Sequence, residues 1–364
     1  MTRYNERKGS NFPAIREGVG VPVDRTPKQN FLDMAKGVVP DYIMQYEFFP
    51  REGAKHAPPI CLVIPSIAND WRRKEEKVDL FGVKWVSVPD ASGALLPEPG
   101  NFLLKDIRQW RDVVKFPDLS GIDWEAMARK DLEACQAMGF DFDQSAKEIT
   151  LHVGYFQTLM ALMGFTEGLI ALYEEPEECK ALLSAVCDFW CEVYDRCFDY
   201  YEPDLFGQSD DIAAWKGPFV SLEMYREIFK PLYEREARFG MERGLPGEFH
   251  NCGRCETLID DWADFGIRYW NPAQTCNDLD DIKRRHADDL VIIGGWDYRG
   301  ELCSPDVSEN YFKQTIIDCY DRLAPGGGFV SMTGVSGDPN DENVKRKNRW
   351  CREVAESYGE YYYR

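Results

Sequence analysis

From residue 149 to the C-terminus, short apolar segments typical of strands alternate with segments of helical periodicity. The stretches 167–201 and 221–244 carry apolar residues at helical spacing. Strands separated by helices pair in parallel, because each helix returns the chain to the starting edge of the sheet. The alternation therefore predicts a parallel α/β fold with strands at Ile149–Val153, Leu205–Gln208, Glu248–Asn251, Arg268–Trp270, Leu290–Ile293 and Phe329–Met332.

One continuous alternation over 364 residues, with no linker, favours a closed (β/α)₈ TIM-type barrel. Earlier segments at Tyr42–Tyr46, Ile60–Ile64 and Val83–Val88 also have the composition of strands. An open doubly wound sheet is the alternative. Its dinucleotide-binding version is disfavoured, because no Gly-x-Gly-x-x-Gly follows a first strand.

The domain boundary is expected near residue 26. Residues 1–25 are polar and without periodicity, which indicates an N-terminal arm, and residues 26–364 are expected to form a single domain. Thr26, Pro27 and Gln29 predict the start of its first helix, since they form a capping box with proline at the first helical position. Gly37 is expected to end that helix.

Composition excludes several classes of protein. The net charge of -20 argues against binding to nucleic acid or to an anionic membrane surface. No run of 18 apolar residues is present, and the first residues lack an apolar signal core. The 12 cysteines have no small-domain disulfide spacing, so reduced thiols in a cytoplasmic protein are expected.

Polar residues follow the predicted ends of successive strands. In a barrel, the carboxyl ends of the strands carry the functional groups. Each residue alone has an ordinary explanation, since Asp210 and Asp211 can simply cap the next helix. Their recurrence predicts a site built from Asp210, Asp211, His250, Cys252, Asn271, Gln274, Trp296 and Asp297.

His250 and Cys252 are two residues apart on an expected strand, so their side chains point to the same side. Imidazole and thiolate together suit zinc. Glu248 shares their face but lies too far along the strand to bind the same ion, and is expected deeper in the barrel. The alternative is a buried thiol beside a hydrogen-bonded core histidine. The candidates for a third ligand are Cys255, Cys276 and the carboxylates Asp210, Asp211 and Asp297.

The chain resembles the uroporphyrinogen decarboxylase superfamily over nearly its whole length after the N-terminal arm. The resemblance implies a (β/α)₈ barrel. It is carried by the order and spacing of Thr26-Pro27-Lys28-Gln29-Asn30-Phe31, Asp79-Leu80-Phe81-Gly82-Val83-Lys84-Trp85, Phe116-Pro117-Asp118-Leu119, Ser209-Asp210-Asp211, Ser221-Leu222-Glu223-Met224-Tyr225, Lys230-Pro231, His250-Asn251-Cys252-Gly253, Asn271-Pro272 and Gly294-Gly295-Trp296-Asp297.

The superfamily has a decarboxylase branch and a branch that transfers methyl groups to or from the cobalt of a corrinoid protein. The Arg-Gln-Ala-Gly-Arg signature of the decarboxylases is absent; residues 42–52 read Tyr-Ile-Met-Gln-Tyr-Glu-Phe-Phe-Pro-Arg-Glu. Thiol-methylating members bind zinc through His-x-Cys and a distant Pro-Gly-Cys. His250 and Cys252 match the first motif, whereas Gly327 stands where the last cysteine is expected.

Three segments resemble methyltransferases of anaerobic O-demethylation: Asp79–Trp85, Pro97-Glu98-Pro99-Gly100 and Lys115-Phe116-Pro117-Asp118. This resemblance implies an enzyme that takes a methyl group from an aryl methyl ether, such as a methoxylated phenol, and delivers it to the cobalt(I) of a corrinoid protein. The partner protein would carry the cobalamin-type cofactor, and a homodimer is expected from the decarboxylase branch. The alternatives are a porphyrinogen decarboxylase and a non-catalytic relative that binds a ligand or a corrinoid protein.

The expected chemistry assigns roles to the candidate residues. A phenolate leaves poorly unless a proton or a Lewis acid meets its developing charge. Asp210 or Asp211 would supply the proton, or a zinc ion at His250 and Cys252 would act as the Lewis acid. The aromatic residues Tyr155, Trp215 and Trp296 would contact the substrate ring, together with the polar residues Glu248, Asn271, Gln274 and Asp297.

Overall fold

The computed structural model describes residues 25–88 and 94–363; the arm expected at the N-terminus lies outside this range except for Arg25. Its main sheet is parallel, as the sequence predicted, and has seven strands where the expected closed barrel has eight. They pair in the order β1-β4-β5-β8-β9-β10-β11. Their bounds are β1 Ile60–Val63, β4 Ala146–Thr150, β5 Leu205–Ser209, β8 Gly247–His250, β9 Ile267–Ala273, β10 Val291–Gly294 and β11 Phe329–Ser331.

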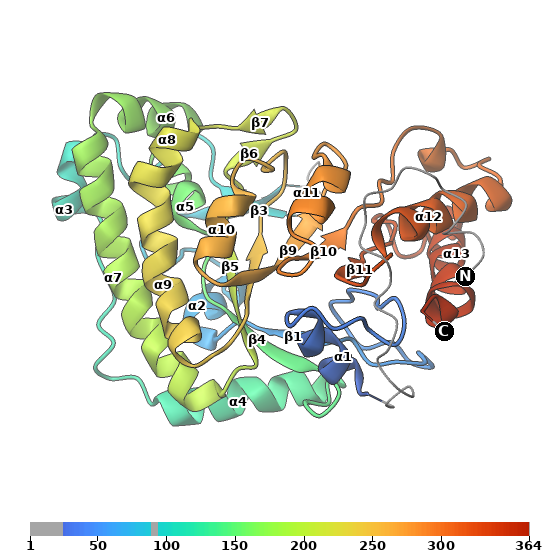
Figure 1. Ribbon diagram of the computed structural model, residues 1–364. Helices are drawn as coiled ribbons and strands as arrows, with labels where there is room; N and C mark the ends of the chain where they lie inside the picture. The colour runs from blue at the N-terminus through green and yellow to red at the C-terminus, as the bar shows by residue number, and fades with distance from the viewer. Residues whose placement is uncertain (1–24, 89–93, 364) are drawn as a thin grey trace.

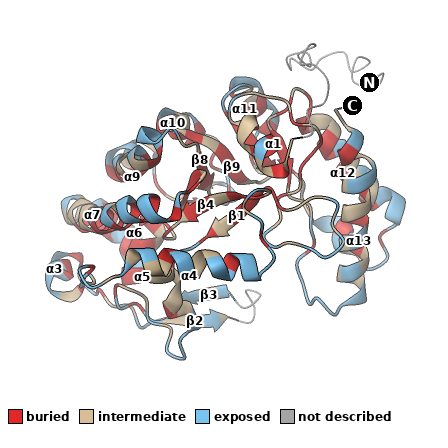
Figure 2. Cartoon of the chain, turned by 90° about the horizontal axis from the view of Figure 1, so that it is seen from below, coloured by how far each residue is buried: buried red, intermediate tan, exposed pale blue. Residues whose placement is uncertain are grey.

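Helices cover the outer side of this sheet, and their buried faces point toward the strands (Figures 1 and 2). The long helices α7 and α9 lie side by side over β5 (Figure 1). The helices are α1 Pro27–Met34, α2 Ser66–Asn69, α3 Trp110–Val113, α4 Trp124–Ala137, α5 Tyr155–Met163, α6 Phe165–Glu174, α7 Pro176–Tyr201, α8 Leu222–Met224, α9 Lys230–Glu242, α10 Ile259–Asp264, α11 Leu279–Arg285, α12 Glu309–Leu323 and α13 Glu342–Ser357.

The inner side of the sheet encloses its own apolar cluster, separate from the core beneath the helices. Helix α1 packs against this cluster, with Phe31 stacked on Tyr269 at 4.3 Å between ring centroids. The capping box predicted at Thr26 and Gln29 is present at the start of α1. Because side chains from the inner face of distant strands contact one another in this cluster, the sheet must be curled. The buried members of the inner cluster are Phe31, Met34, Tyr42, Met44, Tyr46, Ile60, Ala146, Leu205, Tyr269, Val291, Ile293 and Val330.

Among the residues that the structure describes, no regular eighth strand completes the curled sheet. The segment Tyr42–Tyr46, predicted as a strand, lies along β11 and forms only an isolated parallel bridge at Gln45. Two backbone hydrogen bonds hold it there, from Ser331 N to the Met44 oxygen (2.9 Å) and from Tyr46 N to the Ser331 oxygen (2.7 Å). The opposite edge strand of the sheet is β1. The observed fold is therefore a curled half-barrel of seven parallel strands.

Two short hairpins stand outside the parallel sheet. The predicted strand Val83–Val88 becomes β2 (Trp85–Val88), which pairs in antiparallel fashion with β3 (Ala94–Pro97). The second hairpin, β6 (Ala213–Ala214) and β7 (Gly217–Pro218), follows β5.

No single helix within the described ranges is long and apolar enough to cross a membrane; α5 and α6 meet that criterion only as a pair bent by 110°.

Candidate active site

Strands β5, β8, β9 and β10 end at the same edge of the curled sheet, which we call the mouth. The parallel topology brings together side chains from four segments that are distant in sequence. The residues predicted at these ends are Asp210 and Asp211 after β5, His250 and Cys252 at β8, Asn271 and Gln274 at β9, and Trp296 and Asp297 after β10.

Three of these side chains form a compact group, which we call the ligand group. The donor atoms of Asp211, His250 and Cys252 all lie within 4.8 Å of one another, and each residue is half-buried. The Cys252 Sγ is 3.8 Å from His250 Nε2. Asp211 Oδ1 accepts from the Cys252 backbone N–H at 2.9 Å, and its Oδ2 accepts from Gln157 Nε2 at 3.0 Å. One nitrogen, one sulfur and one oxygen are donors that suit zinc.

The electrostatics of the ligand group are unfavourable without a cation. Burial, followed by the negative charge of Asp211, raises the pKa of the Cys252 thiol to about 12. Zinc binds the thiolate form, and its charge would offset both the carboxylate and the thiolate. The donor atoms and their charges thus fit a divalent metal ion.

A buried polar network lies beneath the ligand group. His250 Nδ1 is 2.6 Å from Asn271 Oδ1. The Asn271 amide nitrogen donates to Glu248 Oε1, which also accepts from the Tyr46 hydroxyl at 2.7 Å. Glu248 is only 2% exposed, as expected from its deeper place on the strand.

A second buried carboxyl group, that of Glu148 on β4, also faces the interior. Burial raises its pKa to about 7, while burial and the charge of Glu148 raise the pKa of Glu248 well above its usual range. Gly207, on the strand between them, leaves room for this arrangement: a Cβ there would lie 2.2 Å from Glu148 Oε1 and 2.0 Å from Thr150 Oγ1. Burial and the repulsion between two carboxyl groups in an apolar interior favour retention of a proton by the pair.

Asp210 is fully buried and does not belong to the ligand group. Its carboxylate accepts from the backbone N–H groups of Phe156 (2.8 Å) and Gln157 (3.1 Å), at the N-terminus of α5. The Tyr233 hydroxyl also donates to it. Burial raises the pKa of Asp210 to about 7 even though these hydrogen bonds favour the ionised form. Asp210 therefore anchors α5, and only Asp211 of the predicted pair belongs to the ligand group.

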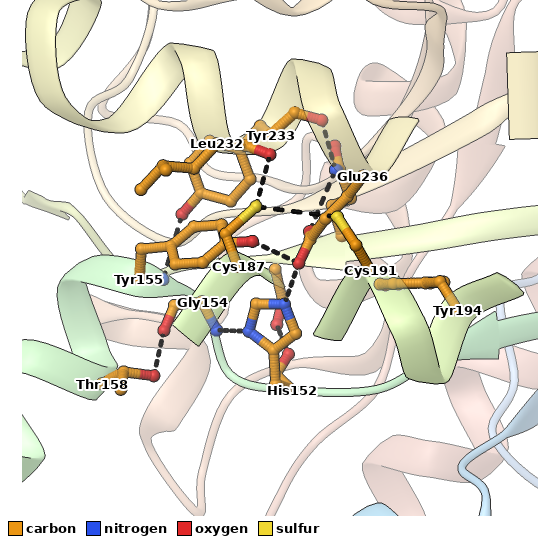
Figure 3. Close-up of polar contacts among 12 residues, drawn as sticks. His152, Gly154, Tyr155, Thr158, Cys187, Cys191, Tyr194, Leu232, Tyr233 and Glu236 are labelled. Atoms are coloured by element: carbon orange, nitrogen blue, oxygen red, sulfur yellow. Dashed lines mark hydrogen bonds and ion pairs between the residues drawn. The ribbon is translucent and has the colours of Figure 1, made fainter. Parts of the chain in front are cut away.

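A hydrogen-bonded cluster around His152 and Glu236 holds the segment between β4 and α5 (Figure 3). His152 Nδ1 accepts from the Gly154 N–H at 3.0 Å, and its Nε2 is 2.7 Å from Glu236 Oε1. Glu236 also accepts from the Tyr155 hydroxyl. The His152 ring stacks on Trp190 at 5.1 Å. Because both ring nitrogens have protein partners, His152 has a structural role in this cluster.

Gly154 permits the close approach of this segment to β5. Its φ is +102°, and a Cβ there would lie 2.2 Å from the Ser209 oxygen and 2.5 Å from Asp210 Cγ. We expect Gly154→Ala to lower the free energy of unfolding by about 2–4 kcal/mol, because strain and overlap both act on the native state. Gly121→Ala is the matched control, since nothing lies within 4 Å of its Cβ position. Equal urea midpoints for the two variants would contradict this prediction.

The predicted aromatic substrate contacts fall in three different environments. Tyr155 is fully buried in the core. Trp296 is half-buried against α12, where its Nε1 donates to Thr315 Oγ1 at 3.0 Å. Trp215 is 46% exposed on the β6–β7 hairpin, with the Arg299 guanidinium 3.7 Å from its ring centroid. Trp215 is the one aromatic candidate of the three that is exposed at the rim.

Two polar candidates are engaged by neighbouring groups. Gln274 Oε1 accepts from the Gly253 N–H at 2.6 Å and fixes the loop after Cys252. Asp297 accepts from Thr275 Oγ1 at 2.6 Å and forms an ion pair with Arg299.

The two cysteines considered as third ligands are not members of the ligand group. Cys255 is fully buried, and its Sγ is 3.9 Å from the Asn251 carbonyl oxygen. Cys276 is half-buried, and its Sγ accepts from Asn277 Nδ2 at 3.6 Å. Among the described residues, the third donor beside His250 and Cys252 is the Asp211 carboxylate.

Sequence reasoning missed Gln157 and Tyr46, which contact the site residues directly. Gln157 lies in the first turn of α5, just after the end of β4, and Tyr46 ends the segment along β11. A search of every strand end for polar groups would have included both. His152 could have been found in the same way, since it follows β4 by two residues.

Residues 102–342 match the family model of uroporphyrinogen decarboxylase (URO-D). The chain belongs to the uroporphyrinogen decarboxylase family. Its fold is similar to that of a methyltransferase from Methanosarcina mazei, with a TM-score of 0.55 and 10% identity over 91% of this chain and 99% of that chain. An L-ribulose 3-epimerase aligns at a TM-score of 0.34 and 11% identity, over 64% of this chain and 74% of that chain. No curated protein sequence is significantly similar to this URO-D family member.

Proposed function

We propose that this URO-D family member is a methyltransferase that moves a methyl group from an aryl methyl ether, such as a methoxylated phenol, to the cobalt(I) of a corrinoid carried by a partner protein. The observation that carries the proposal is the ligand group of Asp211, His250 and Cys252 at the mouth. The similarity of the fold to a methyltransferase supports the reaction class.

The donor set favours an oxygen-containing substrate. Its single thiolate is accompanied by a carboxylate. A metal ion with an oxygen ligand in place of a second sulfur ligand is a harder Lewis acid and prefers oxygen-containing substrates. A zinc ion held there would act as a Lewis acid toward the ether oxygen. A site with two thiolates would be better matched to a thiol substrate. Gly327, where the last cysteine of thiol-methylating relatives was expected, precedes β11 and therefore lies at the edge of the sheet opposite the mouth, so that expectation was wrong and Gly327 does not bear on the third ligand.

The reaction balances with one proton. The electron pair of cobalt(I) forms the cobalt–carbon bond, and the carbon–oxygen bond breaks with its pair remaining on oxygen. That oxygen takes up a proton and leaves as a phenol. Asp211, His250 and Cys252 would hold the metal, which would supply Lewis-acid polarisation of the ether oxygen when bound. In a metal-free enzyme Asp211 would have to deliver the proton, directly or through water.

The complete barrel is part of the same proposal. We infer that Tyr42–Tyr46 acts as the eighth strand, because it is hydrogen-bonded to β11 and places Met44 in the inner cluster. The corrinoid protein, the homodimer and a cytoplasmic location remain predictions.

The charges at the mouth of the sheet give less support to the decarboxylase alternative. A polycarboxylated tetrapyrrole requires several cations at the mouth. The rim arginines Arg254 and Arg299 are each paired with a carboxylate, Glu256 and Asp297 respectively. These pairs leave less positive charge for substrate carboxylates.

The test is incubation of the zinc-loaded protein with cobalt(I) cobalamin or a reduced corrinoid protein and a panel of methoxylated phenols. We expect methyl–cobalt absorbance and an equal amount of phenol. Asp211→Asn should slow the reaction by at least about 100-fold, because it removes an anionic donor. Asp143→Asn, at an exposed aspartate before β4, is the control. Release of carbon dioxide from uroporphyrinogen, with no methyl–cobalt signal from any donor, would establish the decarboxylase instead.

A further inference from the structure

The hydrogen bonds beneath the ligand group determine which nitrogen of His250 carries its proton. Three polar side chains follow one another from the interior to the mouth: Glu248, Asn271 and His250. Glu248 and Asn271 are each only 2% exposed, so water does not compete freely for their hydrogen bonds.

Glu248 sets the orientation of the Asn271 amide. Glu248 Oε1 accepts from both the Tyr46 hydroxyl and the amide nitrogen of Asn271, and it remains an acceptor in the protonated acid when the proton is on Oε2, which has no hydrogen-bond partner among the described residues. A flipped amide would place two oxygens against each other in a buried site, which is unfavourable. The amide oxygen of Asn271 must therefore face His250, where it lies 2.6 Å from Nδ1.

An amide oxygen can only accept, so His250 Nδ1 must donate and therefore carries the proton. In the neutral ring, Nε2 then has a free lone pair. This nitrogen is the one that lies 3.8 Å from Cys252 Sγ within the ligand group. The interior network thus presents the metal-binding form of the imidazole before any metal arrives.

We propose that Glu248 is a positioning residue which, through Asn271, holds His250 in the tautomer that is protonated at Nδ1 and has its Nε2 lone pair directed into the ligand group. The inference rests on the proposed metal site, but not on the identity of the methyl donor. Hydrogen bonds of this kind to a metal-binding histidine typically change metal affinity by about 10–100-fold when they are lost. Glu248 exerts this effect one residue further from the ion than the usual direct partner.

The tautomer can be measured in the metal-free protein by ¹⁵N NMR of histidine-labelled samples, because the chain has only 4 histidines. His250→Gln identifies the His250 signals. We expect a protonated Nδ1 and an unprotonated Nε2 in the wild type. In Glu248→Leu the two nitrogens should move toward a mixture of tautomers, and zinc affinity, measured by chelator competition, should fall about 10–100-fold.

Glu248→Gln is the matched rescue variant, because its side-chain oxygen can still accept from Tyr46 and Asn271. It should retain the wild-type tautomer and a zinc affinity within about 3-fold, well short of the loss expected when the interaction is removed. If Glu248→Leu does not fold, Asn271→Ala should give a mixture of His250 tautomers, and Asn271→Asp should retain the tautomer that is protonated at Nδ1. A wild type protonated at Nε2, or a folded Glu248→Leu with unchanged tautomer and zinc affinity, would overturn the proposal. A wild type with the expected tautomer but no methyl transfer would count against the proposed function alone.

Discussion

Cys252→Ala is expected to lose stoichiometric zinc. The Cys252 thiolate is one of three donors in the ligand group, and the alanine offers no replacement for it. Removing a direct ligand should weaken zinc binding by more than the about 10–100-fold that changes in outer hydrogen-bond partners cost. The measurement is metal analysis of the purified protein together with a chelator-competition titration.

Cys276→Ala provides the matched control for this experiment. Cys276 is close enough for its charge to raise the pKa of Cys252, but it does not belong to the ligand group. We expect its zinc content to equal that of the wild type. Zinc lost from Cys276→Ala but retained by Asp211→Asn would show that the third ligand is a thiolate, and a metal-free wild type with full activity would eliminate the zinc site.

Glu148→Gln is expected to stabilise the protein above neutral pH and leave it almost unchanged near pH 4.5. Burial raises the pKa of Glu148 from 4.5 to about 7 in the folded protein. Between these values the unfolded chain has released a proton that the native state retains, so the wild type loses stability as the pH rises. A pKa difference of this size lowers the free energy of unfolding by on the order of 3 kcal/mol, and the decrease levels off above pH 7.

Urea unfolding at pH 5 and pH 8 measures this effect. The wild type should become less stable between the two pH values, and Glu148→Gln should lose part of that dependence, because Glu248 and Asp210, whose pKa values burial also raises, still contribute in the variant. Glu133→Gln, at an exposed position on α4, is the control and should follow the wild type. If Glu148→Gln and Glu133→Gln show the same change between pH 5 and pH 8, the carboxyl group of Glu148 is not held protonated by the interior.

The strands of the parallel sheet could be located from sequence because each is a short apolar run between helices. Leu205–Gln208 and Arg268–Trp270 were placed within one to three residues of β5 and β9. Val83–Val88 has the same local composition, yet it forms a hairpin with β3. Composition reports that a segment is extended, whereas its pairing partner depends on contacts that are distant in sequence.

The two aspartates after β5 show the same limit within the site. Asp210 and Asp211 are adjacent, and nothing in their local sequence distinguishes them. In the fold, successive side chains point to opposite sides, so Asp210 binds the N-terminus of α5 and Asp211 turns toward Cys252.

The sequence alone determined the α/β class, the family resemblance and the pairing of His250 with Cys252, because strand periodicity and motif spacing are local properties. Only the tertiary structure decided that Asp211 completes the ligand group and that Glu248 supports it through Asn271. These contacts join β5, β8 and β9, which are brought together by parallel pairing across intervening helices. Distances between such segments depend on the curvature that helix packing gives the sheet, and they cannot be read from residue spacing along the chain.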